Sequence, residues 1–221
     1  MQKAIKVLYE DEHLVVFDKP SGLLSIPTPK NERNTLIDLV NQQYAGSLEG
    51  RLHPCHRLDR DTSGAILFAK GKRMQQLMRQ EFEKNAVRKI YIAFVRGRLK
   101  SPHGEIKLPV EDYHQRRYGI HSRPKPALTA YHVKREGQDF SVVEVFPRTG
   151  RTNQIRIHFQ KIGHPLLGER LYAFGRDFPI KFRRVALHAS ELSFHHPVTK
   201  KTVKVASELP EDMQKFLDEH I

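Results

Sequence analysis

Strand-like runs, several of them alternating apolar and polar residues, recur along most of the chain. Alternation with a period of two is typical of half-buried antiparallel strands, because successive side chains point to opposite faces of a sheet. The runs predict eight strands, over residues 5–10, 13–20, 65–70, 89–97, 127–135, 140–147, 185–197 and 201–206.

Helical spacing is less frequent. One apolar stripe follows the spacing i, i+3, i+4, i+8 and consists of Met74, Leu77, Met78 and Phe82. A second helix is expected over residues 152–162, with Thr152 capping its start and Gly163 ending it. A third is expected over residues 209–219, where Pro210 suits a first helical turn.

Strands interrupted by a few helices, without regular alternation of the two, predict an α+β fold with a mixed, mostly antiparallel sheet. The chain contains no tandem repeat, low-complexity tract or Gly/Ser linker. We therefore expect a single domain over residues 1–221.

Charge narrows the choice of partner. The 221 residues carry 38 Lys+Arg against 25 Asp+Glu, a formal net charge of +13. Such an excess attracts polyanions, and RNA is the expected partner, since no long basic amphipathic helix favours a membrane surface. No apolar run approaches the roughly 18–20 residues of a membrane span, and no export signal is recognisable. One cysteine fits a reducing compartment, so we expect a cytoplasmic protein.

The stretch HRLDRDTSG at residues 56–64 concentrates charge beside an apolar run. Residues Thr62 to Gly64 are expected to form the turn that presents it. A carboxylate near buried surface needs a cation and hydrogen bonds to stay ionised, which makes Asp59 a candidate for chemistry. From the spacing alone, a solvated charged turn remains an equal alternative.

Two further positions could carry function. In GRTNQIRIH at 150–158, Arg156 flanks the apolar stripe of the predicted helix, and Arg151 lies at its start, where phosphate could bind. Tyr91 lies in the middle of a predicted strand, where a core role is the more common one.

The cluster His53-Pro54-Cys55-His56 invites a metal site, but no second pair with zinc-like spacing completes four ligands. No P-loop, Gly-x-Gly-x-x-Gly or Gly-x-Ser-x-Gly motif is present. We therefore expect neither a metal nor a cofactor. Arg and aromatic residues alternate at 112–126 and 170–184, a composition that suits stacking on unpaired RNA bases.

The segment CHRLDRDTSGAILF at 55–68 resembles the signature of the RluA family of RNA pseudouridine synthases. Further segments match the family in order: VVFDKPSGLLSIP at 15–27, RKIYIAFVRG at 88–97, GRTNQIRIH at 150–158, GHPLLGERLYA at 163–173 and LHASELSFHHP at 187–197. The resemblance covers nearly the whole chain and implies a short form without an N-terminal S4-type RNA-binding domain.

The resemblance implies roles for individual residues. Asp59 is the implied catalytic aspartate, Arg156 the cation that keeps it ionised, and Tyr91 the ring that stacks on the target uracil. Arg57 is expected beside the flipped nucleotide, and Leu187 in the wall of the pocket.

One position departs from the family pattern, because Asn153 stands where many relatives have histidine. The implied substrate is ribosomal or transfer RNA, with no DNA partner, and we expect a monomer.

Two other functions fit parts of the sequence. A glycoside or nucleoside hydrolase could use Asp59 and Asp61 as paired carboxylates, although residues two apart would lie side by side instead of flanking a bond. A non-catalytic RNA-binding protein or chaperone could use the same scaffold, because a fold does not determine activity.

Overall fold

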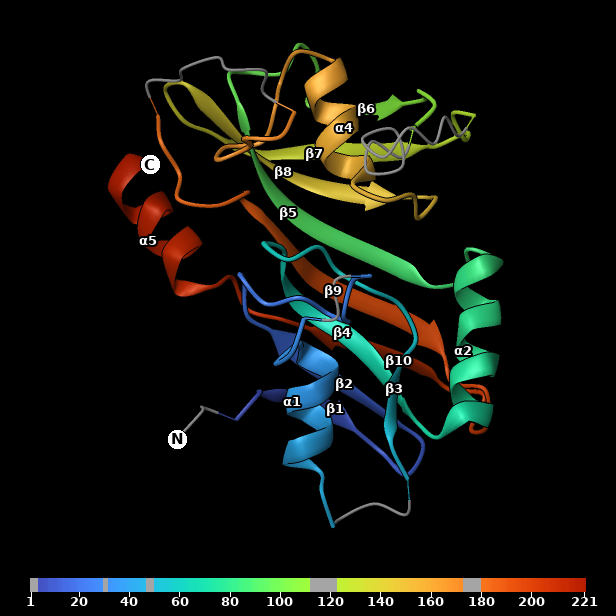
Figure 1. Cartoon of the computed structure of the whole chain (residues 1–221). Coiled ribbons are helices and arrows are strands. Elements are labelled where there is room, and N and C mark those ends of the chain that lie inside the picture. The colour runs from blue at the N-terminus through green and yellow to red at the C-terminus, as the bar shows by residue number, and fades with distance from the viewer. Residues whose placement is uncertain (1–3, 30–31, 47–49, 112–122, 173–179) are drawn as a thin grey trace. The chain divides into compact units, whose positions relative to one another are not determined.

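A computed structural model describes the chain except for residues 1–3, 30–31, 47–49, 112–122 and 173–179 (Figure 1). It divides into two compact units, each assembled from segments that are distant in sequence. Unit 1 comprises Met1–Lys89 and His188–Glu211, and unit 2 comprises Ile90–Leu187 and Asp212–Ile221. That the two units form one catalytic domain stays a prediction.

Unit 1 is built on strands that sequence alternation largely predicts. Its elements are β1 (Val7–Glu10), β2 (Leu14–Lys19), α1 (Leu36–Gln43), β3 (Leu52–Pro54), β4 (Ser63–Lys70), α2 (Lys72–Glu83), β9 (Leu187–His195) and β10 (Thr202–Ala206). Strand β4 pairs antiparallel with β2 and β3, and parallel with β9. Strand β1 extends the sheet beyond β2, and β10 pairs antiparallel with β9.

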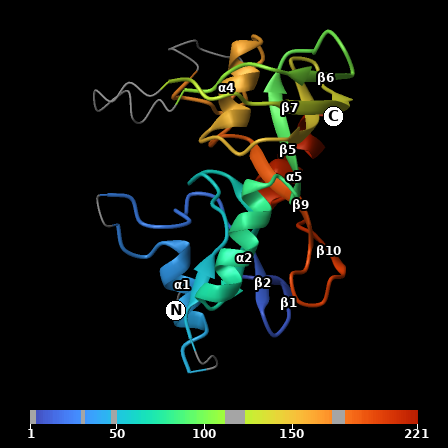
Figure 2. The same cartoon turned by 90° about the vertical axis from the view of Figure 1, so that its right-hand side faces the viewer.

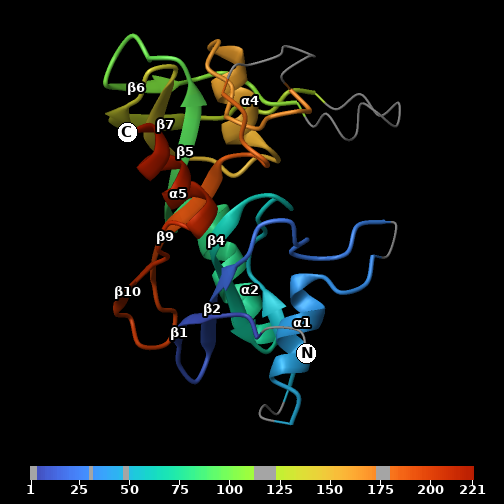
Figure 3. The ribbon, with the colours of Figure 1, turned by 90° about the vertical axis from the view of Figure 1, so that its left-hand side faces the viewer.

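The core of unit 1 lies on β2 and β4, which are buried almost along their whole length. Helix α2 packs against β3 and β4 (Figure 2). Of its predicted apolar stripe, Met74 and Met78 are buried in this core and Phe82 packs against it, but the prediction was wrong for Leu77, which is exposed. Helix α1 packs on β3 (Figure 3). Its start has a capping box, in which Thr35 and Asp38 satisfy each other's backbone N–H groups.

Unit 2 contains an antiparallel sheet in the order β5-β8-β7-β6. Its elements are β5 (Arg88–Arg96), β6 (His103–Ile106), β7 (Thr129–Glu136), β8 (Phe140–Pro147), α4 (Gln154–Lys161) and α5 (Glu211–His220). Helix α4 packs against β7 and β8. Helix α5 attaches through Phe216, whose ring contacts Phe94, Phe140 and Phe182.

The predicted α+β class is confirmed, and all eight predicted strands and three predicted helices are present. Helix α1 and strands β3 and β6 were not predicted, because each is short. No helix in the described part of the chain is long and apolar enough to cross a membrane.

Two local predictions were wrong. Helix α4 is capped by Asn153 instead of Thr152, with the left-handed φ of +53° that an asparagine tolerates well. The predicted turn at Thr62 to Gly64 lies earlier, since the Thr62 N–H donates to the Asp59 carbonyl at 3.2 Å and Ser63 already begins β4.

Gly64 is required where β4 meets β9. Its φ is +108°, and a Cβ there would lie 2.3 Å from the carbonyl oxygen of Ala189, its partner in the parallel pairing. Gly64 and Ala189 both belong to paired main chain, so neither residue can move away without breaking the sheet.

Gly64→Ala is therefore expected to lower the free energy of unfolding by about 3 kcal/mol or more, because strain and overlap add. Urea unfolding measures this. Gly50→Ala is the matched control, because a Cβ there meets nothing within 4 Å, and its expected change is about 0.5 kcal/mol or less. Equal effects of the two substitutions would contradict the packing argument.

Candidate active site

Asp59 lies in unit 1, on the loop that joins β3 to β4. Its side chain is half-buried, its neighbour Leu58 is buried, and Arg57 is exposed. The loop therefore presents one carboxylate at the edge of the core, with an arginine in solvent two residues away.

The main chain on both sides of Asp59 is held by the last residue of β2 and by the segment that follows it. Ser25 donates its hydroxyl to the Leu58 carbonyl at 2.7 Å and accepts the Leu58 N–H at 3.1 Å. The ammonium group of Lys19, which is 0% exposed, donates to the Arg60 carbonyl at 3.0 Å. The same ammonium also donates to the carbonyls of Pro20 and Leu23. Because a lysine has three N–H donors, these contacts tie the two segments together through a single group.

His56 holds the first part of the loop between β3 and β4 against β4 and α2. Its Nε2 accepts the N–H of Leu67 in β4 at 3.0 Å, and its ring stacks on Phe82 of α2. Burial, with a smaller contribution from the Lys89 ammonium, lowers the pKa of His56 to about 3. The imidazole is therefore neutral at physiological pH, as its acceptor role requires.

The candidate metal cluster around Cys55 has other roles. Burial raises the pKa of the Cys55 thiol to about 12, which keeps it protonated, and the Nε2 of His56 is bonded to backbone. Among the described residues, no group of three or more His, Cys, Asp or Glu side chains is arranged to hold a metal ion.

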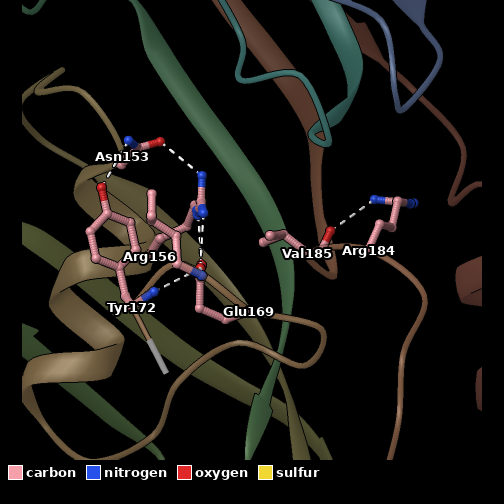
Figure 4. Close-up of polar contacts among 7 residues, drawn as sticks. Asn153, Arg156, Glu169, Tyr172, Arg184 and Val185 are labelled. Atoms are coloured by element: carbon pink, nitrogen blue, oxygen red, sulfur yellow. Dashed lines mark hydrogen bonds and ion pairs between the residues drawn. The ribbon is translucent and has the colours of Figure 1, made fainter. Parts of the chain in front are cut away.

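In unit 2, the structure brings Tyr91 and Leu187 to the same apolar cluster. Tyr91 lies on β5 opposite Val145 and is half-buried, and Leu187 is buried. Arg184 holds the main chain at Leu187, because its Nη1 donates to the carbonyls of Val185 at 3.0 Å and Leu187 at 3.3 Å (Figure 4). Its Nε and Nη2 bind the Asp212 carboxylate.

Helix α4 is oriented by two buried polar residues that face β7. Gln154 donates to the Leu128 carbonyl and to the Thr129 hydroxyl, and His158 contacts that hydroxyl through Nδ1 and the Leu108 carbonyl through Nε2. Their spacing of four residues places both on one face of the helix. Arg156, between them in sequence, projects elsewhere.

Arg156 meets three residues of unit 2 (Figure 4). Its Nε and Nη2 form a bidentate ion pair with Glu169, at 2.6 and 2.9 Å, and its Nη1 donates to the Asn153 side-chain oxygen at 3.0 Å. Its guanidinium carbon lies 5.1 Å from the centre of the Tyr172 ring. Arg151, by contrast, is exposed, and its Nε donates to the Pro126 carbonyl.

The chain is also similar to known proteins. The model of the RNA pseudouridylate synthase family matches residues 13–161, more than half of the chain. The chain belongs to this family. Like its relatives, it is an isomerase that converts uridine in RNA to pseudouridine.

Several curated relatives match most of the chain. The dual-specificity RNA pseudouridine synthase RluA of Pasteurella multocida is 38% identical over 202 residues, covering 89% of this chain and 90% of that protein. RluA of Vibrio vulnificus is 37% identical, covering 87% and 78%. The ribosomal large subunit pseudouridine synthase D of Zymomonas mobilis is 34% identical, covering 95% and 71%.

Among solved structures, the human RNA pseudouridylate synthase domain containing 4 has a TM-score of 0.81 at 22% identity. The match covers 96% of this chain and 91% of the human chain, which shows that the two share a fold.

The site residues predicted from the sequence divide between the two units. Arg57 and Asp59 lie in unit 1, whereas Tyr91, Arg151, Arg156 and Leu187 lie in unit 2. The pairing of Asp59 with Arg156 stays a prediction. Residues 112–122 and 173–179, which belong to the two predicted RNA-contacting segments, lie outside the described residues.

Sequence reasoning missed the residues that hold the site in place. Lys19 and Ser25 lie in the first family motif, and Glu169 in GHPLLGERLYA, yet none was given a role. Their positions in matched motifs were the available signal.

The neutral His56 predicts a dependence of stability on pH. Its folded-state pKa lies below the unfolded value of about 6.5, so the unfolded chain binds more protons between the two values. The free energy of unfolding therefore falls as the pH drops below about 6.5, and the loss due to His56 approaches about 2 kcal/mol at pH 5.

Urea unfolding at pH 7.5, 6 and 5 checks this against His56→Gln, whose amide oxygen can accept the same N–H without titrating. The variant should lose about 2 kcal/mol less than wild type between pH 7.5 and 5. Burial also lowers the pKa of His158, but that residue is present in both proteins. Parallel pH curves would rule out His56 as the source.

Proposed function

We propose that this pseudouridine synthase acts on uridines of ribosomal or transfer RNA, with Asp59 as the catalytic carboxylate. Arg156 is the cation that keeps Asp59 ionised, and Tyr91 stacks on the uracil. Leu187 lines the pocket, Arg57 lies beside the flipped nucleotide, and Arg151 contacts the RNA backbone.

The observation that carries the proposal is the way the Asp59 loop is held. Ser25 and Lys19 bond the main chain at Leu58 and Arg60, so the residue between them has little freedom, although its side chain reaches the surface. A solvated charged turn has no need for a buried ammonium group beneath it. Fixing a reactive group before substrate arrives is what catalysis by orientation requires.

The proposed chemistry is an isomerisation. The N1–C1′ bond of uridine breaks, the uracil turns, and C5 bonds to C1′. C5 then loses its proton and N1 gains one, so the product is an isomer of uridine. Asp59 acts as a nucleophile at C1′ or as a base toward a ribose proton, and both routes need its ionised form. The target base leaves its stack to reach Asp59, at a cost of a few kcal/mol. The net charge of +13 supplies attraction to the RNA backbone that offsets this cost.

The relatives support the substrate class. They include synthases named for dual specificity and for the large ribosomal subunit. Unmodified transcripts of ribosomal and transfer RNA are therefore the substrates to test first.

Asp59→Asn is expected to lower the rate of pseudouridine formation by about 10³-fold or more, because the amide can neither attack C1′ nor accept a proton. RNA binding should change little. Carbodiimide labelling followed by primer extension maps the modified positions, and release of tritium from C5-labelled uridine gives the rate.

Asp61→Asn is the matched control, since it removes a half-buried carboxylate from the same loop, two residues away. We expect it to keep most of its activity. Loss of activity in both variants, accompanied by release of free uracil, would favour the hydrolase with paired carboxylates. Salt-sensitive RNA binding by wild type without any modification would favour a non-catalytic RNA-binding protein.

A further inference from the structure

Helix α2 of unit 1 has a row of exposed polar side chains along one side. Lys72, Gln76 and Arg79 follow the spacing i, i+4, i+7, which places them on the same side of a helix. Gln75 lies three residues after Lys72 and four before Arg79, and its side-chain amide donates to the Pro54 carbonyl at 2.8 Å. The row therefore runs beside β3 (Figure 2).

Strand β3 adds positive charge to the same surface. Arg51, just before the strand, is exposed, and His53 is half-buried. Burial lowers the pKa of His53 and the charges of Lys72 and Arg51 lower it further, so a cation from α2 and one from the start of β3 both lie close to this imidazole. The charge of Arg79 acts on Cys55, where it opposes the rise in thiol pKa that burial causes. We call the following residues the α2–β3 surface: Arg51, His53, Lys72, Gln76 and Arg79.

The positive charges on α2 lack acidic partners in the described part of the chain. Neither Lys72 nor Arg79 forms an ion pair there, and α2 has acidic residues only in its last turn. Its first turn holds Lys72 and Arg73 and no acidic residue. Because the N-terminus of a helix carries partial positive charge, the two cations are repelled there, where an aspartate or glutamate would stabilise the helix.

This arrangement favours an anionic partner over a purely structural role. A helix selected for stability alone would carry acidic residues where α2 begins. Lys72 and Arg79 are about 10 Å apart along the helix axis, at a rise of 1.5 Å per residue, which suits successive groups of a polyanion better than one small anion. RNA is the polyanion on which this chain acts, and its backbone phosphates are the usual partners of exposed lysine and arginine.

The α2–β3 surface leads to the candidate catalytic loop within the same unit. Strand β3 ends at Pro54, and the chain continues through His56, whose ring stacks on Phe82 of α2. Arg57 follows and is exposed, two residues before Asp59. RNA that lies along α2 and β3 can therefore continue to the loop that carries Asp59.

We propose that the α2–β3 surface binds the phosphate backbone of the RNA beside the target uridine. The contacts hold the substrate without reading its bases, because lysine and arginine contact phosphates in any sequence. The inference rests on the proposed role of Asp59, since that role decides which loop receives the target uridine, and it involves unit 1 alone.

Lys72→Gln combined with Arg79→Gln tests the proposal, because glutamine keeps the helix propensity while both charges are removed. On a transcript that wild type modifies, kcat/KM from tritium release should fall about 10-fold or more, chiefly through KM, as loss of uniform binding does. Filter binding over a range of salt concentrations gives the second readout. The slope of log Kd against log salt concentration should decrease by about 1.5, since each phosphate contact contributes about 0.7–0.9.

Lys200→Gln combined with Lys201→Gln is the matched control. Both lysines are exposed in unit 1, on the turn between β9 and β10, and the pair of substitutions removes the same amount of charge. We expect kcat/KM within about twofold of wild type and an unchanged salt slope, because exposed charges away from a contact are screened. An equal loss in both double variants would mean that only net charge attracts the RNA, which would overturn the proposal.

Two further measurements separate RNA binding from folding. The urea midpoint of the Lys72, Arg79 double variant should equal or exceed that of wild type, because one cation is removed from the start of a helix. Arg79→Lys keeps the charge and should lose at most about threefold in kcat/KM. A lower urea midpoint together with a loss of kcat at unchanged KM would assign the two residues a structural role and overturn the proposal.

The remaining outcomes distinguish the partner and the function. A double variant that binds RNA as wild type does, but loses binding to vesicles containing phosphatidylserine, would assign the surface to membranes and overturn the proposal. Wild type that modifies no ribosomal or transfer RNA would defeat the proposed function. Active wild type whose double variant keeps its KM and salt slope would defeat only this inference.

Discussion

The buried ammonium group of Lys19 is the contact on which the candidate catalytic loop depends. It joins the segment after β2 to the residue that follows Asp59. Separating the two segments would leave a buried charge and several carbonyl groups without hydrogen bonds, and each such loss costs about 1–3 kcal/mol. The loop between β3 and β4 is therefore held by a residue that lies far earlier in the chain, and its conformation follows from the packing of β2 against β4.

Unit 2 also contains a buried charged group bonded to main chain, but its charge is negative. There the buried charge is the carboxylate of Glu169, which accepts backbone N–H groups and binds the partly buried guanidinium of Arg156. In both units a fully buried charged group is bonded to main chain and in turn restricts either a candidate site residue or the loop that carries one. Buried ion pairs contribute little net stability, so the value of the Arg156–Glu169 pair lies in the geometry that it imposes.

Most of the fold could be predicted from local patterns. The longer strands bury whole faces, and a buried face appears in the sequence as a regular spacing of apolar residues. Helix α1 escaped notice although Thr35 and Asp38 mark its start, since eight residues carry too few apolar positions to show a stripe. The residues that support the candidate site were harder to predict from the sequence. In the sequence Lys19 and Glu169 look like ordinary surface charges, and only contacts between distant segments bury them. Asn153 carried a readable signal, since asparagine tolerates the left-handed backbone that α4 needs at its cap.

The proposed reaction gives a reason for two separate charges to be held in place. In forming pseudouridine the uracil stays in the pocket, turns, and is joined again through a different atom, so no co-reactant is consumed. In the proposed mechanism Asp59 supplies an ionised carboxylate and Arg156 a cation, and both must stay in place while the base turns. A mobile loop would displace the carboxylate, and a rotating guanidinium would withdraw the cation. The hydrogen bonds of Lys19 oppose the first motion within unit 1, and the ion pair with Glu169 opposes the second within unit 2.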